Sequence, residues 1–210
     1  MLYKRNQVEE AVSRTLGEQS ENPSSELRTR LKRLLDADRG LGRKPRSVDP
    51  DLANYAFYSS DAPGKGIEVE FTGYEAFALM TSLRLLQHGW PQGFAVSMLR
   101  RVRPELEQEH ARFLRQDRNK LFDEEAIRKN AREGDIALNN TDPVFLVIVS
   151  GDFPATDNLA GSVCRGVRKA FEFVREKNGR SWTLHELVTS GHALLAELSK
   201  VQPRKRGRNA

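Results

Sequence analysis

The segment from Phe71 to Val102 does most to decide how this chain can fold. Thr72-Gly73-Tyr74-Glu75 has the pattern of a capping box, in which the threonine caps a helix and the glutamate bonds back to it. The apolar residues that follow point in most directions around a helix, which is typical of a buried helix. They are Phe77, Leu79, Met80, Leu83, Leu85 and Leu86. Gly89 suits the left-handed end of that helix, and Pro91 suits the start of another. The segment therefore predicts two core helices with a tight corner between them.

The composition excludes several classes of protein. Hydrophobic residues make up 38% of the 210 residues and charged residues 30%, as in a globular protein with a highly charged surface. The single cysteine, Cys164, excludes an intramolecular disulfide and a multi-cysteine zinc site, and no histidine has a partner at a recognised metal spacing. The longest apolar run, Val144 to Val149, is far shorter than a membrane span, and the N-terminus lacks the apolar run of a signal peptide. We expect a cytoplasmic protein, nucleoid-associated in a bacterium, with no membrane partner.

The net charge of +5 is concentrated at two places. Residues 27–46 hold eight basic residues against two acidic ones, and residues 202–210 hold four basic residues and no acid. The rest of the chain is therefore net acidic. This distribution favours binding to a polyanion such as nucleic acid. The alternative is a solvated helix face together with a solubilising tail.

The first seventy residues predict two helices, a loop and a β-hairpin. The helices cover residues 5–16 and a stretch from Ser24 or Ser25 to about Asp38, whose leucines form one apolar stripe. Residues 39–54 are rich in glycine, proline and basic residues, so we expect a loop there. Tyr55–Tyr58 and Ile67–Phe71 have the composition of strands and predict the hairpin, with Lys65 near its tip.

The second half of the chain predicts a charged helix followed by a small α+β module. Residues 104–132 form either one long helix with a narrow apolar stripe, suited to a homodimer interface, or a surface helix packed on its own domain. Residues 144–149 predict a buried strand, and residues 163–177 a helix whose first residues also fit a strand. Thr183 and Glu186 form a second capping-box pattern, which predicts a helix through about Leu198.

Together these patterns predict an α+β fold that is mostly helical. We expect a winged-helix-like module over residues 1–103, a charged connecting or dimerising helix over 104–134, a small α+β module over 135–201 and a disordered basic tail over 202–210.

The core segment resembles the second half of a MerR-type winged-helix domain. That family has a Tyr/Phe-Ser/Thr-x-x-Asp/Glu helix start, an apolar helix, a Leu-Gly-Phe corner and a helix that ends in paired apolar residues. The counterparts here are Phe71-Thr72, Glu75, the helix to Gln87, His88-Gly89-Trp90 and Met98-Leu99. In element order the resemblance extends over residues 5–103. The arginine-tyrosine-tyrosine signature of the family's recognition helix is missing from residues 25–38.

The resemblance implies a transcriptional regulator that binds double-stranded DNA. Its recognition-helix side chains would be Arg28, Thr29, Lys32 and Arg33, and its phosphate contacts would be Arg43, Lys44 and Lys65. A second interpretation places Arg100, Arg101 and Arg103 on the DNA instead. The tail adds Arg204, Lys205, Arg206 and Arg208, either as an AT-hook-like arm around Arg206-Gly207-Arg208 or as a disordered basic tail.

Two other functions compete with this prediction. The first is a protein-interaction adaptor that docks a partner through residues 144–200. The second is an enzyme that uses Cys164 or Asp152, but the sequence has neither a catalytic constellation nor a glycine-rich phosphate loop. We therefore expect no enzyme activity and no cofactor or metal.

Overall fold

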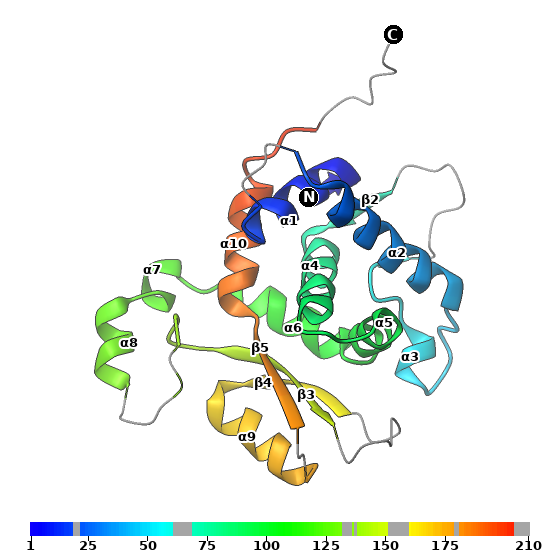
Figure 1. Cartoon of the computed structure of the whole chain (residues 1–210). Coiled ribbons are helices and arrows are strands. Elements are labelled where there is room, and N and C mark those ends of the chain that lie inside the picture. The colour runs from blue at the N-terminus through cyan, green and yellow to red at the C-terminus, as the bar shows by residue number, and fades with distance from the viewer. Residues whose placement is uncertain are drawn as a thin grey trace. The chain divides into compact units, whose positions relative to one another are not determined.

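The predicted core segment forms two helices, α4 (Gly73–Gln87) and α5 (Gln92–Arg101), in a computed structural model of the chain (Figure 1). The structure describes residues 1–18, 22–60, 69–131, 136, 138–150, 160–178 and 181–203. The predicted capping box is confirmed, because the Thr72 hydroxyl accepts from the Glu75 N–H and the Glu75 carboxylate accepts from the Thr72 N–H. Gly89 has the expected left-handed conformation, with φ of +86°. Pro91 is the N-cap of α5, one position before the helix.

The chain divides into two compact units. Unit 1 comprises Met1–Arg103 together with Ala193–Ala210, and unit 2 comprises Pro104–His192. The described elements are mostly helical, with a small antiparallel sheet of two strands and another of three. The predicted α+β class is confirmed at this level.

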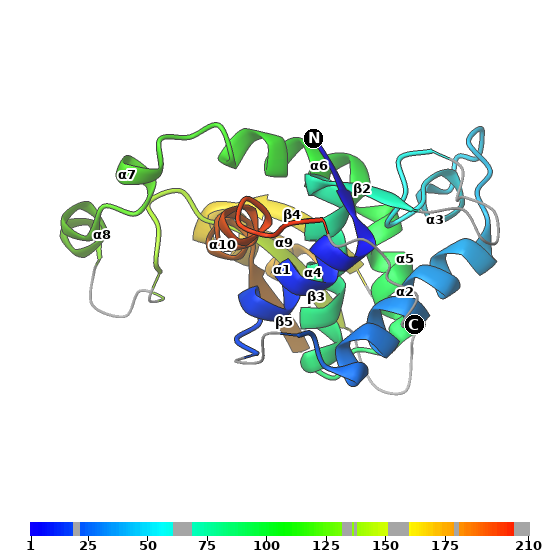
Figure 2. The same ribbon diagram turned by 90° about the horizontal axis from the view of Figure 1, so that it is seen from above.

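In unit 1 the helices α1 (Arg5–Thr15) and α2 (Ser25–Leu41) pack around α4 together with α5 (Figures 1 and 2). Both predicted N-terminal helices are confirmed. The Ser24 hydroxyl caps α2 by accepting from the Leu27 N–H, and the predicted leucine stripe of this helix is buried. One short helix, α3 (Pro50–Ala53), lies within the predicted loop.

The predicted β-hairpin is wrong. Residues 55–58 are not a strand, and β2 (Glu70–Thr72) pairs antiparallel with β1 (Leu2–Lys4). The aromatic content of residues 55–58 reflects burial instead, since all four residues are buried and two of their amides donate to the Asp38 side chain. Lys65, expected at the hairpin tip, lies outside the described residues.

The charged segment after residue 103 is not one long helix. It forms α6 (Arg103–Phe113), α7 (Arg118–Leu121) and α8 (Glu124–Asn130). The physical reason is local capping, because the side chains of Asp117 and Asp123 accept hydrogen bonds from backbone amides that begin α7 and α8. Residues 103–130 therefore do not form the single helix with a continuous apolar stripe that was predicted as a homodimer interface.

Unit 2 contains a three-stranded antiparallel sheet in the order β4-β3-β5, formed by β3 (Val144–Ser150), β4 (Ala160–Arg165) and β5 (Ser181–Glu186). The helix α9 (Gly166–Glu176) packs on one face (Figure 1), where Ala170 and Val174 join a cluster that includes Val147. The predicted strand at 144–149 is confirmed. The helix predicted from residue 163 begins at Gly166, because the residues before it complete β4.

The second predicted capping box is wrong. Thr183 and Glu186 lie in β5, and the helix α10 (Val188–Leu198) begins only after them. The Glu186 carboxylate caps this helix directly, accepting from the Val188 N–H at 2.7 Å and the Thr189 N–H at 3.0 Å. The pattern therefore contains the real capping glutamate, but its threonine belongs to a strand.

Two buried histidines in unit 2, His110 and His192, lie close to Phe113. The His110 ring meets the Phe113 ring edge-on at 5.4 Å, and the Nε2 atom of His192 lies 3.1 Å from the Phe113 carbonyl oxygen. Burial and the nearby His192 lower the pKa of His110 to about 4. Burial also lowers the pKa of His192. Both rings are therefore held neutral at physiological pH.

We expect the Thr72→Ala substitution to lower the free energy of unfolding by about 1 kcal/mol, because the Glu75 amide loses its side-chain acceptor. The Thr29→Ala substitution is the matched control. Thr29 lies exposed in the interior of α2, where alanine is the better helix former, so this variant should be as stable as the wild type or slightly more stable. Urea denaturation followed by circular dichroism measures both. Equal losses in the two variants would contradict the capping role.

The His110→Phe substitution should remove part of the acid sensitivity of the fold. Native His110 stays neutral down to about pH 4, whereas the unfolded chain takes up a proton below about pH 6.5. The free energy of unfolding should therefore fall as the pH falls between these values, by about 3 kcal/mol in total from this residue. Urea unfolding at several pH values tests this. The idea fails if the variant and the wild type lose stability in parallel.

Candidate nucleic-acid interface

The four predicted recognition-helix residues lie on the exposed face of α2. The leucines that pack into the core occupy the other side of the helix. The exposed residues follow helical spacing, so they form two neighbouring rows on one surface. They are Arg28, Thr29, Lys32 and Arg33. The structure therefore brings these four together, as the leucine stripe predicted.

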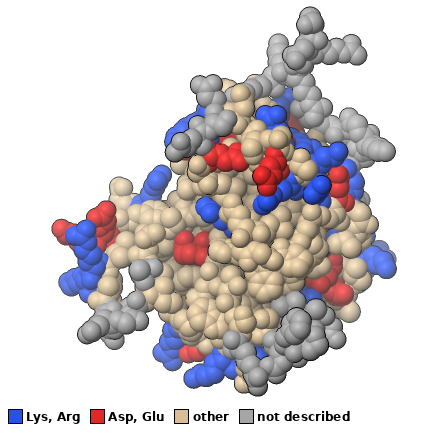
Figure 3. All heavy atoms as spheres, in the orientation of Figure 1, with Lys and Arg blue, Asp and Glu red and all other residues tan. Residues whose placement is uncertain are grey.

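The side chains on this face differ in how far they are already engaged. The Nε atom of Arg28 lies 3.8 Å from the Glu9 carboxylate, and the Thr29 hydroxyl donates to the Ser25 carbonyl oxygen at 2.8 Å. Lys32 and Arg33 have no ion-pair partner in the part of the chain that the structure describes. Their charges are therefore the most available to an anionic ligand. Figure 3 shows that the region of α2 carries side chains of both signs, so it is not a uniformly basic surface.

The predicted phosphate contacts after α2 are in two different environments. The Arg43 guanidinium lies over the Tyr55 ring at 5.7 Å and is partly buried, whereas Lys44 is exposed. Arg46 is also exposed, and with Lys44 and Leu52 it lines an open surface cavity. In the charge pattern of the sequence, Arg46 is only one of the eight basic residues of the segment 27–46. Its position beside Lys44 makes it an additional candidate contact.

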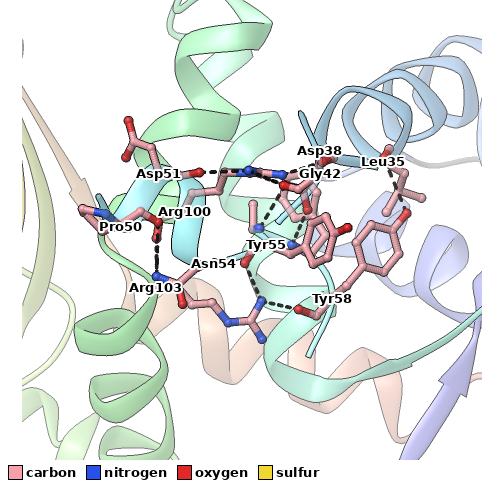
Figure 4. Close-up of polar contacts among 12 residues, drawn as sticks. Leu35, Asp38, Gly42, Pro50, Asp51, Asn54, Tyr55, Tyr58, Arg100 and Arg103 are labelled. Carbon is pink, nitrogen blue, oxygen red and sulfur yellow. Dashed lines mark hydrogen bonds and ion pairs between the residues drawn. The ribbon is translucent and has the colours of Figure 1, made fainter. Parts of the chain in front are cut away.

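A buried ion pair fixes this loop against α2 (Figure 4). The Nε atom of Arg100, from α5, donates to the Asp38 carboxylate at 2.6 Å, and neither side chain is exposed. The Nη1 atom of Arg100 donates to the carbonyl oxygens of Gly42 and Asp51, both at 2.9 Å. One guanidinium therefore holds the end of α2 and the start of α3 at the same time.

The Asp38 carboxylate completes this network from the other side. It accepts hydrogen bonds from the backbone N–H groups of Ala56 and Phe57, at 3.1 and 3.0 Å. A buried charge is tolerated only when it is paired and its remaining lone pairs are satisfied, and Asp38 meets both conditions. The pair therefore links α2, α5 and residues 55–58 into one assembly.

Arg103 holds residues 55–59 in a similar way. Its Nη1 atom donates to the carbonyl oxygens of Tyr55 and Tyr58 at 2.7 and 2.8 Å, and its guanidinium lies over the Tyr74 ring at 5.1 Å. The Glu75 carboxylate accepts from both the amide and the hydroxyl of Ser59. The interpretation that places Arg100 and Arg103 on DNA is therefore wrong, because both are buried inside unit 1. Arg101 is exposed but forms two hydrogen bonds to the Asp51 carboxylate.

The remaining predicted contacts lie outside the described residues. They are Lys65, Arg204, Lys205, Arg206 and Arg208.

The two catalytic candidates gain no support. Asp152 lies outside the described residues, and burial raises the pKa of the Cys164 thiol, which disfavours the reactive thiolate. Among the described residues, no group of three or more His, Cys, Asp and Glu side chains is placed to hold a metal ion. No helix in the described ranges is long and apolar enough to cross a membrane.

Sequence reasoning did not find the role of Arg100. Its place in the run Arg100-Arg101-Val102-Arg103 suggests an exposed basic cluster, and only the fold shows that it faces Asp38, sixty-two residues away. A signal was present in the helical spacing, because Val96 lies one helical turn before Arg100 on α5 and is fully buried.

We expect the Arg100→Met substitution to lower the free energy of unfolding by about 3–5 kcal/mol, because it leaves Asp38 buried and unpaired. Arg101→Met is the matched control on the same helix. Its ion pair with Asp51 is exposed, so the loss should be at most about 1 kcal/mol. The Asp38→Asn and Arg100→Met double variant should be more stable than Arg100→Met alone. Urea unfolding gives all three values, and similar losses for the two arginines would contradict the assigned network.

No protein-family model matches this chain, and neither a curated protein nor a solved structure matches it.

Proposed function

We propose that the protein is a regulator that binds duplex DNA through the exposed face of α2 and the adjoining loop. The observation that carries the proposal is the pair of exposed cations, Lys32 and Arg33, on a helix whose opposite side is fixed in the core. An α-helix fits the major groove of B-DNA, where side chains of its exposed face reach bases and phosphates. Arg28 and Thr29 extend the same face by one helical turn.

The loop after α2 supplies the expected phosphate contacts in place of the hairpin. Lys44 and Arg46 are exposed on it, and the Arg100 hydrogen bonds to Gly42 and Asp51 hold the backbone on both sides of them. A loop that is already ordered loses little conformational entropy on binding. Phosphate contacts of this kind give affinity and salt dependence, and base contacts from α2 would give sequence preference.

A second candidate function, the protein-interaction adaptor, is favoured by one observation in unit 2. Phe171 and Trp182 pack edge-to-face with ring centroids 5.5 Å apart, yet they remain 38% and 45% exposed. Exposed aromatic side chains of this size are enriched in protein interfaces. This pair lies within the residues 144–200 that the adaptor hypothesis assigns to partner docking.

The Lys32→Glu and Arg33→Glu double substitution tests the DNA-binding proposal. It should lower affinity for a mixed-sequence duplex roughly tenfold or more at low salt, and reduce the slope of log K against log salt by about 2, because two phosphate-facing charges are reversed. Fluorescence anisotropy over a salt series measures both quantities with the full-length chain.

The Arg128→Glu and Lys129→Glu double variant is the matched control, since it reverses two exposed charges on α8. Its affinity should stay much closer to that of the wild type. If both double variants weaken binding equally, the effect is one of net charge and the assignment of α2 is wrong. If wild-type protein shows no DNA binding at low salt, the adaptor becomes the better hypothesis.

A further inference from the structure

Unit 2 contains a cleft that the DNA-binding proposal does not use. Its volume is about 340 Å³, and it lies along α6 and the end of β4. The lining residues are Gln108, Glu109, Ala111, Arg112, Arg115 and Arg165. Three of these six are arginines, so several guanidinium groups surround one small concavity. Ligand pockets in proteins begin at about this size.

Two of the arginines are fixed in place by carboxylates. The Nε atom of Arg112 lies 2.7 Å from the Glu109 carboxylate and its Nη1 atom 2.7 Å from Asp142, while the Nη2 atom of Arg165 lies 2.8 Å from Glu109. The hydrogen bonds from Arg112 to both carboxylates, and from Arg165 to Glu109, lower the pKa of Glu109 and that of Asp142. Both acids therefore stay ionised at physiological pH and hold the two guanidinium groups in a defined geometry.

The third arginine leaves the cleft with an excess of positive charge. Arg115 is exposed and has no ion-pair partner within the described ranges. Arg165 is 44% exposed at its side chain, and its Nε and Nη1 donors make no hydrogen bond to any described residue. The Nη2 atom of Arg112 is buried in the wall and likewise has no partner. Several guanidinium donors therefore remain after the internal ion pairs are formed.

We propose that this cleft binds the oxyanion group, phosphate or carboxylate, of a small ligand. Arg115 and Arg165 make the contacts, and Glu109 and Asp142 are positioning residues that orient the guanidinium groups. Arginine presents N–H groups in a planar fork that matches two oxygens of a carboxylate or phosphate. The inference is independent of the proposed DNA-binding function, because none of its residues belongs to α2 or the loop after it.

A small ligand fits the cleft better than a nucleic-acid backbone does. The ionised Glu109 lies within the lining, and Glu105 and Glu107 are exposed on the same helix. A duplex presents a continuous row of phosphates, which would meet these carboxylates as well as the arginines. Neither Glu105 nor Glu107 lines the cleft, so a single oxyanion group inside it would meet Arg115 and Arg165 but neither of these two acids as a lining residue.

Isothermal titration calorimetry of the full chain tests the proposal with two probes, pyrophosphate and citrate, at matched ionic strength set with sodium chloride. We expect saturable binding of at least one probe at concentrations up to about 10 mM. The preferred probe distinguishes a phosphate-bearing from a carboxylate-bearing ligand. The Arg115→Gln substitution should weaken binding roughly tenfold, since it removes a charge-assisted contact.

The Arg128→Gln substitution on α8 is the matched control, because it removes an exposed arginine from the same unit outside the cleft. It should leave probe affinity unchanged. Equal weakening by the two variants, or no binding of either probe, overturns the proposal. If Arg115→Gln weakens binding to a DNA duplex while neither probe binds, the arginines belong to a nucleic-acid surface and the small-ligand assignment is wrong.

Discussion

The buried ion pair between Asp38 and Arg100 holds together the part of unit 1 that the proposed function needs. Both side chains are fully buried, and each has further hydrogen bonds to backbone atoms. Such pairs stabilise a fold only when every donor and acceptor is satisfied, since the desolvation of two charges otherwise exceeds their attraction. Asp38 and Arg100 meet this requirement through the backbone groups that surround them in this arrangement. A loop placed elsewhere would leave a carboxylate or a guanidinium without partners.

Local patterns predicted the main helices of unit 1 well and its strands poorly, and they missed the division of the charged segment into α6, α7 and α8. The capping box at Thr72 and the glycine at position 89 act over three or four residues, so the sequence shows them directly. The strand β2 pairs with β1, which lies almost seventy residues earlier in the chain, and no local pattern indicates such a partner. Residues 55–58 look like a strand because buried irregular backbone also requires apolar side chains. The capping-box prediction at Thr183 also failed because its pattern is local. Four residues of this type fit a strand end as well as a helix start.

The sequence predicted which face of α2 is exposed, but not which of the basic residues there are available to a ligand. Helical spacing correctly separates the leucines of α2 from its exposed residues. A count of basic residues, however, treats all of them alike, and the structure divides them by their contacts. Arg30 pairs with Glu26, Arg43 lies over an aromatic ring, and only Lys32 and Arg33 are left without an ion pair on the exposed face, within the described residues. These differences depend on which carboxylates and rings the fold brings near each cation, so they follow from packing and not from composition.

The small number of basic residues without an ion pair also limits how strongly the described surface can bind a polyanion. Each phosphate contact contributes about −0.9 to the slope of log K against log salt on B-DNA, so the four contacts of the proposed surface, from Lys32, Arg33, Lys44 and Arg46, would give a slope of about −4. Proteins that rely on so few contacts gain specificity from base readout or from additional arms. Among the other predicted contacts on α2, Thr29 has its hydroxyl donor engaged within the helix, which leaves Arg28 as the side chain with a guanidinium fork for guanine. Sequence preference on this surface would therefore be narrow and centred on G·C pairs, and any preference for A·T-rich DNA would have to come from another part of the chain.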